Sequence, residues 1–148
     1  MAKFTQSIAI KAPIERVYEV VSDFERYPDF LKEVESAEVV SSGKNRARVS
    51  FELKLVTKIH YTVDFKLTPP KSLKWTLVEG EFMKGNDGSW ELEALEKNLT
   101  DATFTIDVEF PGWVPKSMGE SVINSGMPGM LKGFKHEAER KASPKSRK

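Results

Sequence analysis

ARVSFELKL (residues 47–55) and IHYTVDFKL (residues 59–67) alternate apolar and polar residues almost without exception. A period of two places the apolar side chains of a strand on one face and the polar ones on the other. Each stretch therefore predicts a β-strand with one dry and one solvated face, which is typical of antiparallel sheet. Because few helical segments are available to cover the dry face, we expect a curved sheet that encloses a cavity, and a cavity suggests a ligand.

The composition predicts one domain that folds without disulfide bonds. The chain has 148 residues, 39% hydrophobic and 30% charged, with a formal net charge of +1. It contains no cysteine, which excludes a disulfide scaffold, a thiol nucleophile and a thiolate metal site. No apolar run approaches the roughly 20 residues that span a bilayer, and the N-terminus lacks a signal-peptide core. We therefore expect a cytoplasmic protein, or one that is peripheral to a membrane.

The basic residues are concentrated at the C-terminal end. From Lys132 onward, seven Lys or Arg residues stand against Glu137 and Glu139, a local charge of +5. A basic tail can contact phosphate on lipid or RNA, although a solvated helix end is the more ordinary interpretation. We predict a single domain over residues 1–142 and a basic disordered tail over residues 143–148.

The remaining segments predict a helical pair, further strands and a closing helix. Pro13 suits the first position of a helix, a Tyr-Pro pair at 27–28 interrupts it, and a second short helix follows at 29–32. Pro115 begins a long closing helix, in which Pro128 predicts a kink or break. Further strands are predicted at residues 4–10, 34–40, 73–77, 90–94 and 102–110, with a turn at 41–45 and a loop at 80–88.

This element order predicts an α+β fold. We expect a seven-stranded curved antiparallel sheet, two short helices after the first strand, and a long C-terminal helix across the concave face. The motifs that carry a family resemblance are IKAP (10–13), VYEVVSDFERYP (17–28), LVEGEF (77–82), GSW (88–90) and FKHEAE (134–139). With them the chain resembles the START-like, helix-grip (SRPBCC) superfamily. More narrowly, it resembles the branch of coenzyme Q-binding proteins, polyketide cyclase/dehydrase-type lipid-transport domains and the ribosome-association toxin.

The resemblance implies an apolar ligand held between the sheet and the C-terminal helix. No cofactor, metal site or catalytic set is expected. Carried over to this sequence, the ligand-binding residues are Phe24, Tyr27, Phe30, Leu53, Tyr61, Phe65, Trp75, Phe82, Trp90, Phe104, Met118, Val122, Met127, Met130, Leu131 and Phe134.

Few residues suggest chemistry. His60 falls on the outward face of its strand, and His136 lies among basic residues, so both are expected to be surface residues rather than metal ligands. Glu79 and Glu81 flank a glycine where burial could make one of them a general base, although a solvated loop is the more ordinary interpretation. Trp113 is expected at the pocket mouth or at a membrane interface.

Three functions remain open at this point. The first is a non-enzymatic carrier of a quinone, lipid or polyketide, in which the methionines of the last helix adapt to the ligand or simply pack in the core. The second is a regulator that binds a macromolecule such as the ribosome or RNA through the basic tail. The third is a polyketide cyclase or aromatase, with Tyr61 or Glu81 supplying an acid or base.

Overall fold

The computed structural model describes the backbone of residues 2–54 and 58–142. The predicted tail at 143–148 and the end of the first alternating stretch therefore lie outside the described residues. The elements are β1 (Ala2–Ile10), α1 (Ile14–Ser22), η1 (Phe24–Arg26), α2 (Tyr27–Phe30), β2 (Val34–Gly43), β3 (Arg46–Lys54), β4 (Lys58–Thr68), β5 (Ser72–Gly80), β6 (Gly85–Glu96), β7 (Leu99–Glu109) and α3 (Lys116–Ala142).

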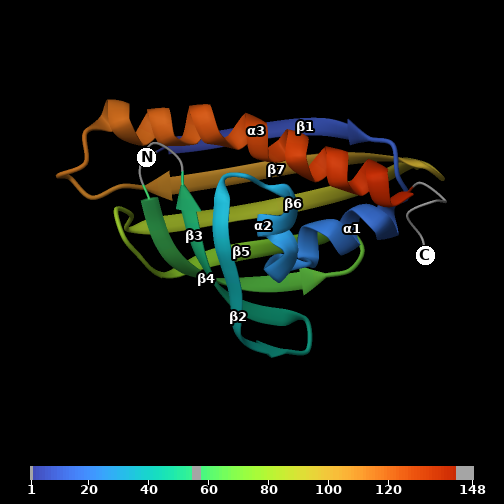
Figure 1. Ribbon diagram of the computed structural model, residues 1–148, viewed down its shortest axis with the longest axis horizontal. Coiled ribbons are helices and arrows are strands. Elements are labelled where there is room, and N and C mark those ends of the chain that lie inside the picture. The colour runs from blue at the N-terminus through green and yellow to red at the C-terminus, as the bar shows by residue number, and fades with distance from the viewer. Residues whose placement is uncertain (1, 55–57, 143–148) are drawn as a thin grey trace.

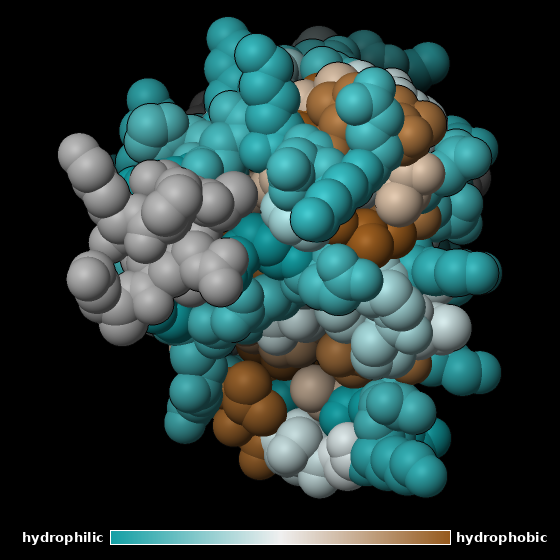
Figure 2. Space-filling view, turned by 90° about the vertical axis from the view of Figure 1, so that its right-hand side faces the viewer, coloured by the Kyte–Doolittle hydropathy of each residue, from teal (hydrophilic) through white to brown (hydrophobic). Residues whose placement is uncertain are grey.

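The strands form one curved antiparallel sheet in the order β1-β7-β6-β5-β4-β3-β2. In Figure 1, α3 crosses the sheet from end to end, and α1 and α2 lie on the same side of the sheet as α3. The predicted architecture is thus confirmed. Figure 2 shows the end of the molecule on the right of Figure 1, where most visible side chains are hydrophilic and hydrophobic residues form small separate groups.

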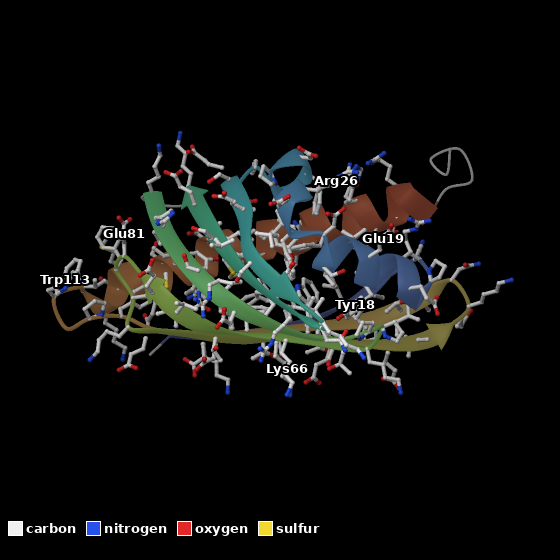
Figure 3. All side chains as sticks on the ribbon, turned by 90° about the horizontal axis from the view of Figure 1, so that it is seen from below. Tyr18, Glu19, Arg26, Lys66, Glu81 and Trp113 are labelled. Atoms are coloured by element: carbon white, nitrogen blue, oxygen red, sulfur yellow. The ribbon has the colours of Figure 1, made fainter. Side chains whose placement is uncertain are left out.

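The period of two in β3 and β4 produces the predicted dry and wet faces. Val49 pairs with Val63 and Phe51 with Tyr61 in register, and Val49 and Val63 are buried in the core. On the opposite face Arg48 pairs with Asp64, and its guanidinium donates to the carboxylate at 2.7 and 3.0 Å. Figure 3 shows the side chains of this outer face, Lys66 among them, projecting away from the helices.

Two predicted loops are wrong in extent. The segment 80–88 is mostly strand: β5 continues to Gly80 and β6 begins at Gly85, so only residues 81–84 connect them. The turn at 41–45 is shorter than predicted because β2 continues to Gly43 and Asn45 supplies the left-handed conformation, with φ at 58°. Both segments are rich in small and polar residues, which are typical of loops. Pairing with neighbouring strands nevertheless keeps most of these residues extended.

The second short helix lies earlier than predicted. It spans Tyr27–Phe30, not 29–32, and Pro28 stands in its first turn. A proline is tolerated there because the first turn of a helix has no partner for its N–H groups.

The sequence predicts a kink or a break at Pro128. The closing helix is continuous from Lys116 to Ala142, so the break is wrong. The proline has no N–H to donate to the Asn124 carbonyl, but burial of Met127 and Leu131 on either side holds the helix together. Glycines let α3 approach its neighbours closely. A Cβ at Gly119 would lie 2.6 Å from the ring of Phe110.

Candidate functional site

A partly enclosed cavity of about 80 Å³ lies between the concave face of the sheet and α3. A single water needs about 10–15 Å³ of such space, so the cavity has room for several waters or a small ring. A drug-sized site has about 300–1,000 Å³, so a larger ligand requires movement of the wall. Its lining residues are Tyr27, Val34, Phe51, Leu53, Ile59, Tyr61, Val63, Phe65, Trp75, Met83, Asn86, Trp90, Phe104, Ile106, Val108, Phe110, Val122, Ile123, Met127, Met130 and Phe134.

Aromatic rings form much of the cavity wall. Tyr27 stacks on Phe51 at a centroid distance of 5.7 Å and meets Phe134 edge-on at 5.0 Å. Phe134 in turn meets Trp90 edge-on at 5.2 Å. These contacts connect α2, the sheet and α3 directly. These aromatic side chains therefore fill part of the interior in which the sequence predicts a ligand.

Most residues of the predicted pocket line this cavity. The ones that do are Tyr27, Leu53, Tyr61, Phe65, Trp75, Trp90, Phe104, Val122, Met127, Met130 and Phe134. The ones outside its lining are Phe24, Phe30, Phe82, Met118 and Leu131.

The outlying residues have other neighbours. Phe24 stacks on Phe65 with centroids 4.1 Å apart, so it lies behind the cavity wall. Phe30 contacts the edge of Phe134, and Phe82 contacts Trp113. Leu131 is buried in the core, and Met118 is half-buried in the first turn of α3. These five residues are as apolar as those that line the cavity, so hydrophobicity alone does not distinguish the two groups.

Ten lining residues lie outside the predicted pocket. Most lie at the apolar positions of alternating strands, and period-two alternation could have found them. Met83 and Asn86 had no such signal because the segment that holds them resembles a loop. The missed residues are Val34, Phe51, Ile59, Val63, Met83, Asn86, Ile106, Val108, Phe110 and Ile123.

Asn86 is the one lining residue with a polar amide, and it is 2% exposed. The indole Nε1–H of Trp75 donates to Asn86 Oδ1 at 3.0 Å. Because an indole N–H can only donate, this contact fixes which end of the amide is oxygen. The Nδ2 group faces Met83 Sδ at 3.8 Å, a weak acceptor.

Two of the lining residues are tyrosines, Tyr27 and Tyr61. The Tyr27 hydroxyl donates to the backbone carbonyl of Val21. Within the described chain, the Tyr61 hydroxyl has no hydrogen-bond partner. Burial raises the pKa of both phenols above the ordinary value, so both keep their protons at neutral pH.

The other titratable candidates lie outside the cavity. Glu81 is exposed, and its Oε1 accepts from the backbone N–H of His60 at 3.3 Å. His60 and His136 are both exposed. Across the described residues, no three His, Cys, Asp or Glu side chains converge on a possible metal site. None of the described helices combines the length and apolarity of a membrane span.

Trp113 lies in the connection between β7 and α3 and is 68% exposed. Its ring lies 5.5 Å from that of Phe82, which has a left-handed backbone with φ at 64°. Figure 3 shows Trp113 and Glu81 at the same end of the molecule. We call this the Trp113 end, formed by residues 81–84 and 110–115.

Sequence comparisons place the chain among known proteins. Residues 10–135 match the profile of the family described as polyketide cyclase / dehydrase and lipid transport. The ribosome association toxin RatA of Escherichia coli is 27% identical over 112 residues, which cover 74% of this chain and 70% of RatA. RatA of Vibrio cholerae is 23% identical over 140 residues, covering 94% of this chain and 96% of RatA.

Solved structures share the fold. The Zhui aromatase/cyclase from a Streptomyces species superposes with a TM-score of 0.90 at 19% identity, covering 97% of this chain and 96% of that one. A START superfamily protein from Mycobacterium smegmatis superposes with a TM-score of 0.83 at 17% identity, covering 95% and 99%. At such low identities the similarity establishes the fold alone.

Proposed function

Because the chain belongs to the polyketide cyclase/dehydrase and lipid transport family, we propose that it binds and carries a small apolar ligand beneath α3. The observation that carries this proposal is the cavity itself, whose lining residues are all apolar or aromatic apart from Asn86. Burial of about 100 Å² of apolar ligand surface there contributes about 2.5 kcal/mol. A quinone, a lipid chain or a polyketide satisfies this requirement.

Uptake of such a ligand requires the wall to move, because the cavity is small. Tyr61, Phe110 and Met130 are the lining residues that keep part of their surface exposed. They lie on β4, directly after β7 and on α3. We propose that the ligand enters past these three side chains, with α3 as the element that moves. The missing hydrogen bond at Pro128 weakens α3 close to Met130.

Native mass spectrometry of gently purified protein, followed by extraction and lipid analysis, tests the carrier function. We expect a co-purified apolar molecule, or uptake of offered quinones and lipids with one ligand per chain. Val122→Phe fills the cavity and should abolish uptake, whereas Asn124→Phe on the exposed face of the same helix should retain it. An empty protein that takes up nothing offered contradicts the proposal.

We further propose that the protein contacts a membrane when it loads or releases its ligand. Trp113 and Phe82 place an exposed aromatic pair at the Trp113 end, the same end as the cavity residues Met83 and Phe110. Amphipathic aromatic rings are favoured at the level of lipid headgroups. An apolar ligand could then pass between the bilayer and the cavity without crossing water.

A second candidate function is regulation through a nucleic-acid-rich partner such as the ribosome. Arg46 pairs with Lys66 and Lys66 with Lys74, so three exposed cations stand in one row across β3, β4 and β5. None of the three forms a salt bridge with a described residue. A row of cations fits phosphate groups, and the RatA relatives are named for ribosome association.

A cyclase or aromatase function has weaker support. The fold is shared with an aromatase/cyclase. However, of the two acid or base candidates, only Tyr61 lines the cavity, and its raised pKa disfavours a role as base. Carboxylates and imidazoles do not occur among the described lining residues.

A further inference from the structure

The two halves of α3 are held to the rest of the protein in different ways. We infer that residues 116–127 form a lid over the cavity, which swings about Pro128 and Gly129 while residues 130–142 stay fixed. Because α3 starts directly after the connection that holds Trp113, this motion opens the cavity at the Trp113 end. The inference rests on the proposed carrier function, since it names the part of α3 that moves when a ligand enters.

Hydrogen bonds tie the C-terminal half of α3 to the end of β1. Lys135 Nζ donates to the Ala9 carbonyl at 2.6 Å. The backbone N–H of Lys11 donates to Glu139 Oε2 at 2.9 Å. Lys135 and Glu139 also form an ion pair at 2.6 Å, so the two ties belong to one network. Bonds to charged groups are directional, and these fix the position of the helix end relative to the sheet.

Close packing adds a second anchor to this half. Phe134 meets the rings of Tyr27 and Phe30 edge-on. A Cβ at Gly133 would lie 2.5 Å from Leu31 Cδ2 and 3.1 Å from the Phe30 carbonyl, so α3 approaches the α2–β2 connection closely. Figure 1 shows α1 and α2 beside this half of α3, drawn in red. A shift of the C-terminal half would break these contacts together with the bonds to β1.

The N-terminal half of α3 contacts the sheet through apolar groups. Val122, Ile123 and Met127 are buried and line the cavity. Across the described chain, no hydrogen bond or ion pair joins residues 116–127 to a strand or to another helix. Apolar contacts are non-directional, so this half can lift from the sheet without breaking a directional bond. An apolar ligand then covers the surface that the lifted helix exposes.

A weak point of the helix lies at the boundary between the two halves. Pro128 has no N–H, so the Asn124 carbonyl lacks its partner inside the helix. Gly126 and Gly129 stand on either side of the proline, and glycine tolerates a wide range of backbone angles. Sharp bends in helices occur at such prolines and glycines. The boundary can therefore act as a hinge while both halves stay helical.

Thiol labelling tests the inference without any ligand, because the chain has no native cysteine. Ile123 is 4% exposed under the lid, and Ala138 is 1% exposed under the fixed half. The Ile123→Cys variant should react with a chromogenic disulfide reagent about tenfold faster than Ala138→Cys, at a rate that low urea changes little. The Ala138→Cys variant should react only through global unfolding, which urea accelerates steeply. Each rate is compared with the free energy of unfolding of the same variant, so a destabilised variant is not mistaken for an open lid.

Removal of the anchor provides the reciprocal measurement. Lys135→Met keeps the length of the side chain but loses the bond to the Ala9 carbonyl. Added to Ala138→Cys, it should produce fast labelling that depends little on urea. Added to Ile123→Cys, it should change the labelling rate less than about twofold, because that half already opens alone.

Two results overturn the inference. Equal rates with the same steep urea dependence show that α3 opens only with the whole fold, and faster labelling of Ala138→Cys shows that the other half moves. Native mass spectrometry with offered quinones and lipids decides the carrier function separately. Ligand uptake without local opening at Ile123→Cys overturns the lid alone, and an opening lid in a protein that takes up nothing overturns the carrier function alone.

Discussion

Trp75 donates its indole N–H to Asn86 across two neighbouring strands, and this bond sets the polar end of the cavity. The indole lies against Gly88, which is the register partner of Trp75 on β6. A side chain at position 88 would occupy the space of the ring. Gly88 therefore supports the proposed ligand site by leaving room for the Trp75 ring, although Gly88 does not line the cavity.

Gly88→Ala should destabilise the fold and disturb the cavity. The added Cβ would lie 2.1 Å from Trp75 Cζ2 and 2.7 Å from the Thr105 carbonyl, so the indole must move away from Asn86. We expect a loss of about 2 kcal/mol in the free energy of unfolding, measured by urea denaturation, and a changed tryptophan emission. Gly112→Ala is the control, because its added Cβ meets no atom within 4 Å. Equal stability of the two variants would refute the packing argument.

Pro128→Ala should stabilise the protein and slow ligand uptake. Alanine restores the hydrogen bond to the Asn124 carbonyl inside α3, for an expected gain of about 2 kcal/mol after allowance for the unfolded chain. Urea denaturation and stopped-flow tryptophan fluorescence measure the two effects. Pro115→Ala, just before α3, should give no such gain. A destabilised Pro128→Ala variant would show that the proline does not weaken the helix.

Trp113→Ala should weaken association with lipid vesicles. The exposed indole is the largest apolar surface at the Trp113 end, and its loss should reduce partitioning about tenfold. Flotation with phosphatidylcholine and phosphatidylglycerol vesicles measures this partitioning. Leu95→Ala removes another exposed apolar side chain, near the β6–β7 turn, and should have little effect. The same loss in both variants would rule out a specific membrane-facing end.

Lys66→Glu should have opposite effects on stability and on ribosome binding. A carboxylate between Arg46 and Lys74 replaces two cross-strand repulsions by attractions, for a gain of about 0.5 kcal/mol in stability. The same change interrupts the row of cations, so co-sedimentation with ribosomes should weaken and lose part of its salt dependence. Lys97→Glu, in the β6–β7 turn, is the charge-matched control. Ribosome binding that responds equally to both changes, or to neither, contradicts a role for this row.

The architecture could be predicted because most of the strands carry a period-two signal. Val49, Phe51 and Val63 show it clearly, and alternation alone specifies which face of the sheet is dry. The errors fall where local signals compete with tertiary packing. Pro128 signals a break, but burial of its neighbours keeps α3 whole, and Gly85 to Gly88 resemble a loop until they pair with β7.

The candidate site was less accessible to sequence reasoning. Hydrophobic pattern locates the interior but does not separate a lining residue such as Phe65 from the supporting Phe24 that stacks behind it. Asn86 gave no signal, because its role depends on a hydrogen bond with a residue eleven positions earlier on another strand. A polar contact of this kind depends on the register of the strands. It also depends on Gly88, which leaves room for the Trp75 ring.

Methionine methyl groups offer the most direct test of ligand binding beneath α3. Met83, Met127 and Met130 line the cavity. Met118 lies on α3, as Met127 and Met130 do, but it is not a lining residue. In a protein labelled with ¹³C at the methionine methyls, NMR spectra are recorded during titration with 1-tetralone. The account predicts saturable shifts of the three lining methyls, with Met118 unmoved. Unchanged lining methyls, or a Met118 that shifts as much as they do, would contradict a ligand site in this cavity.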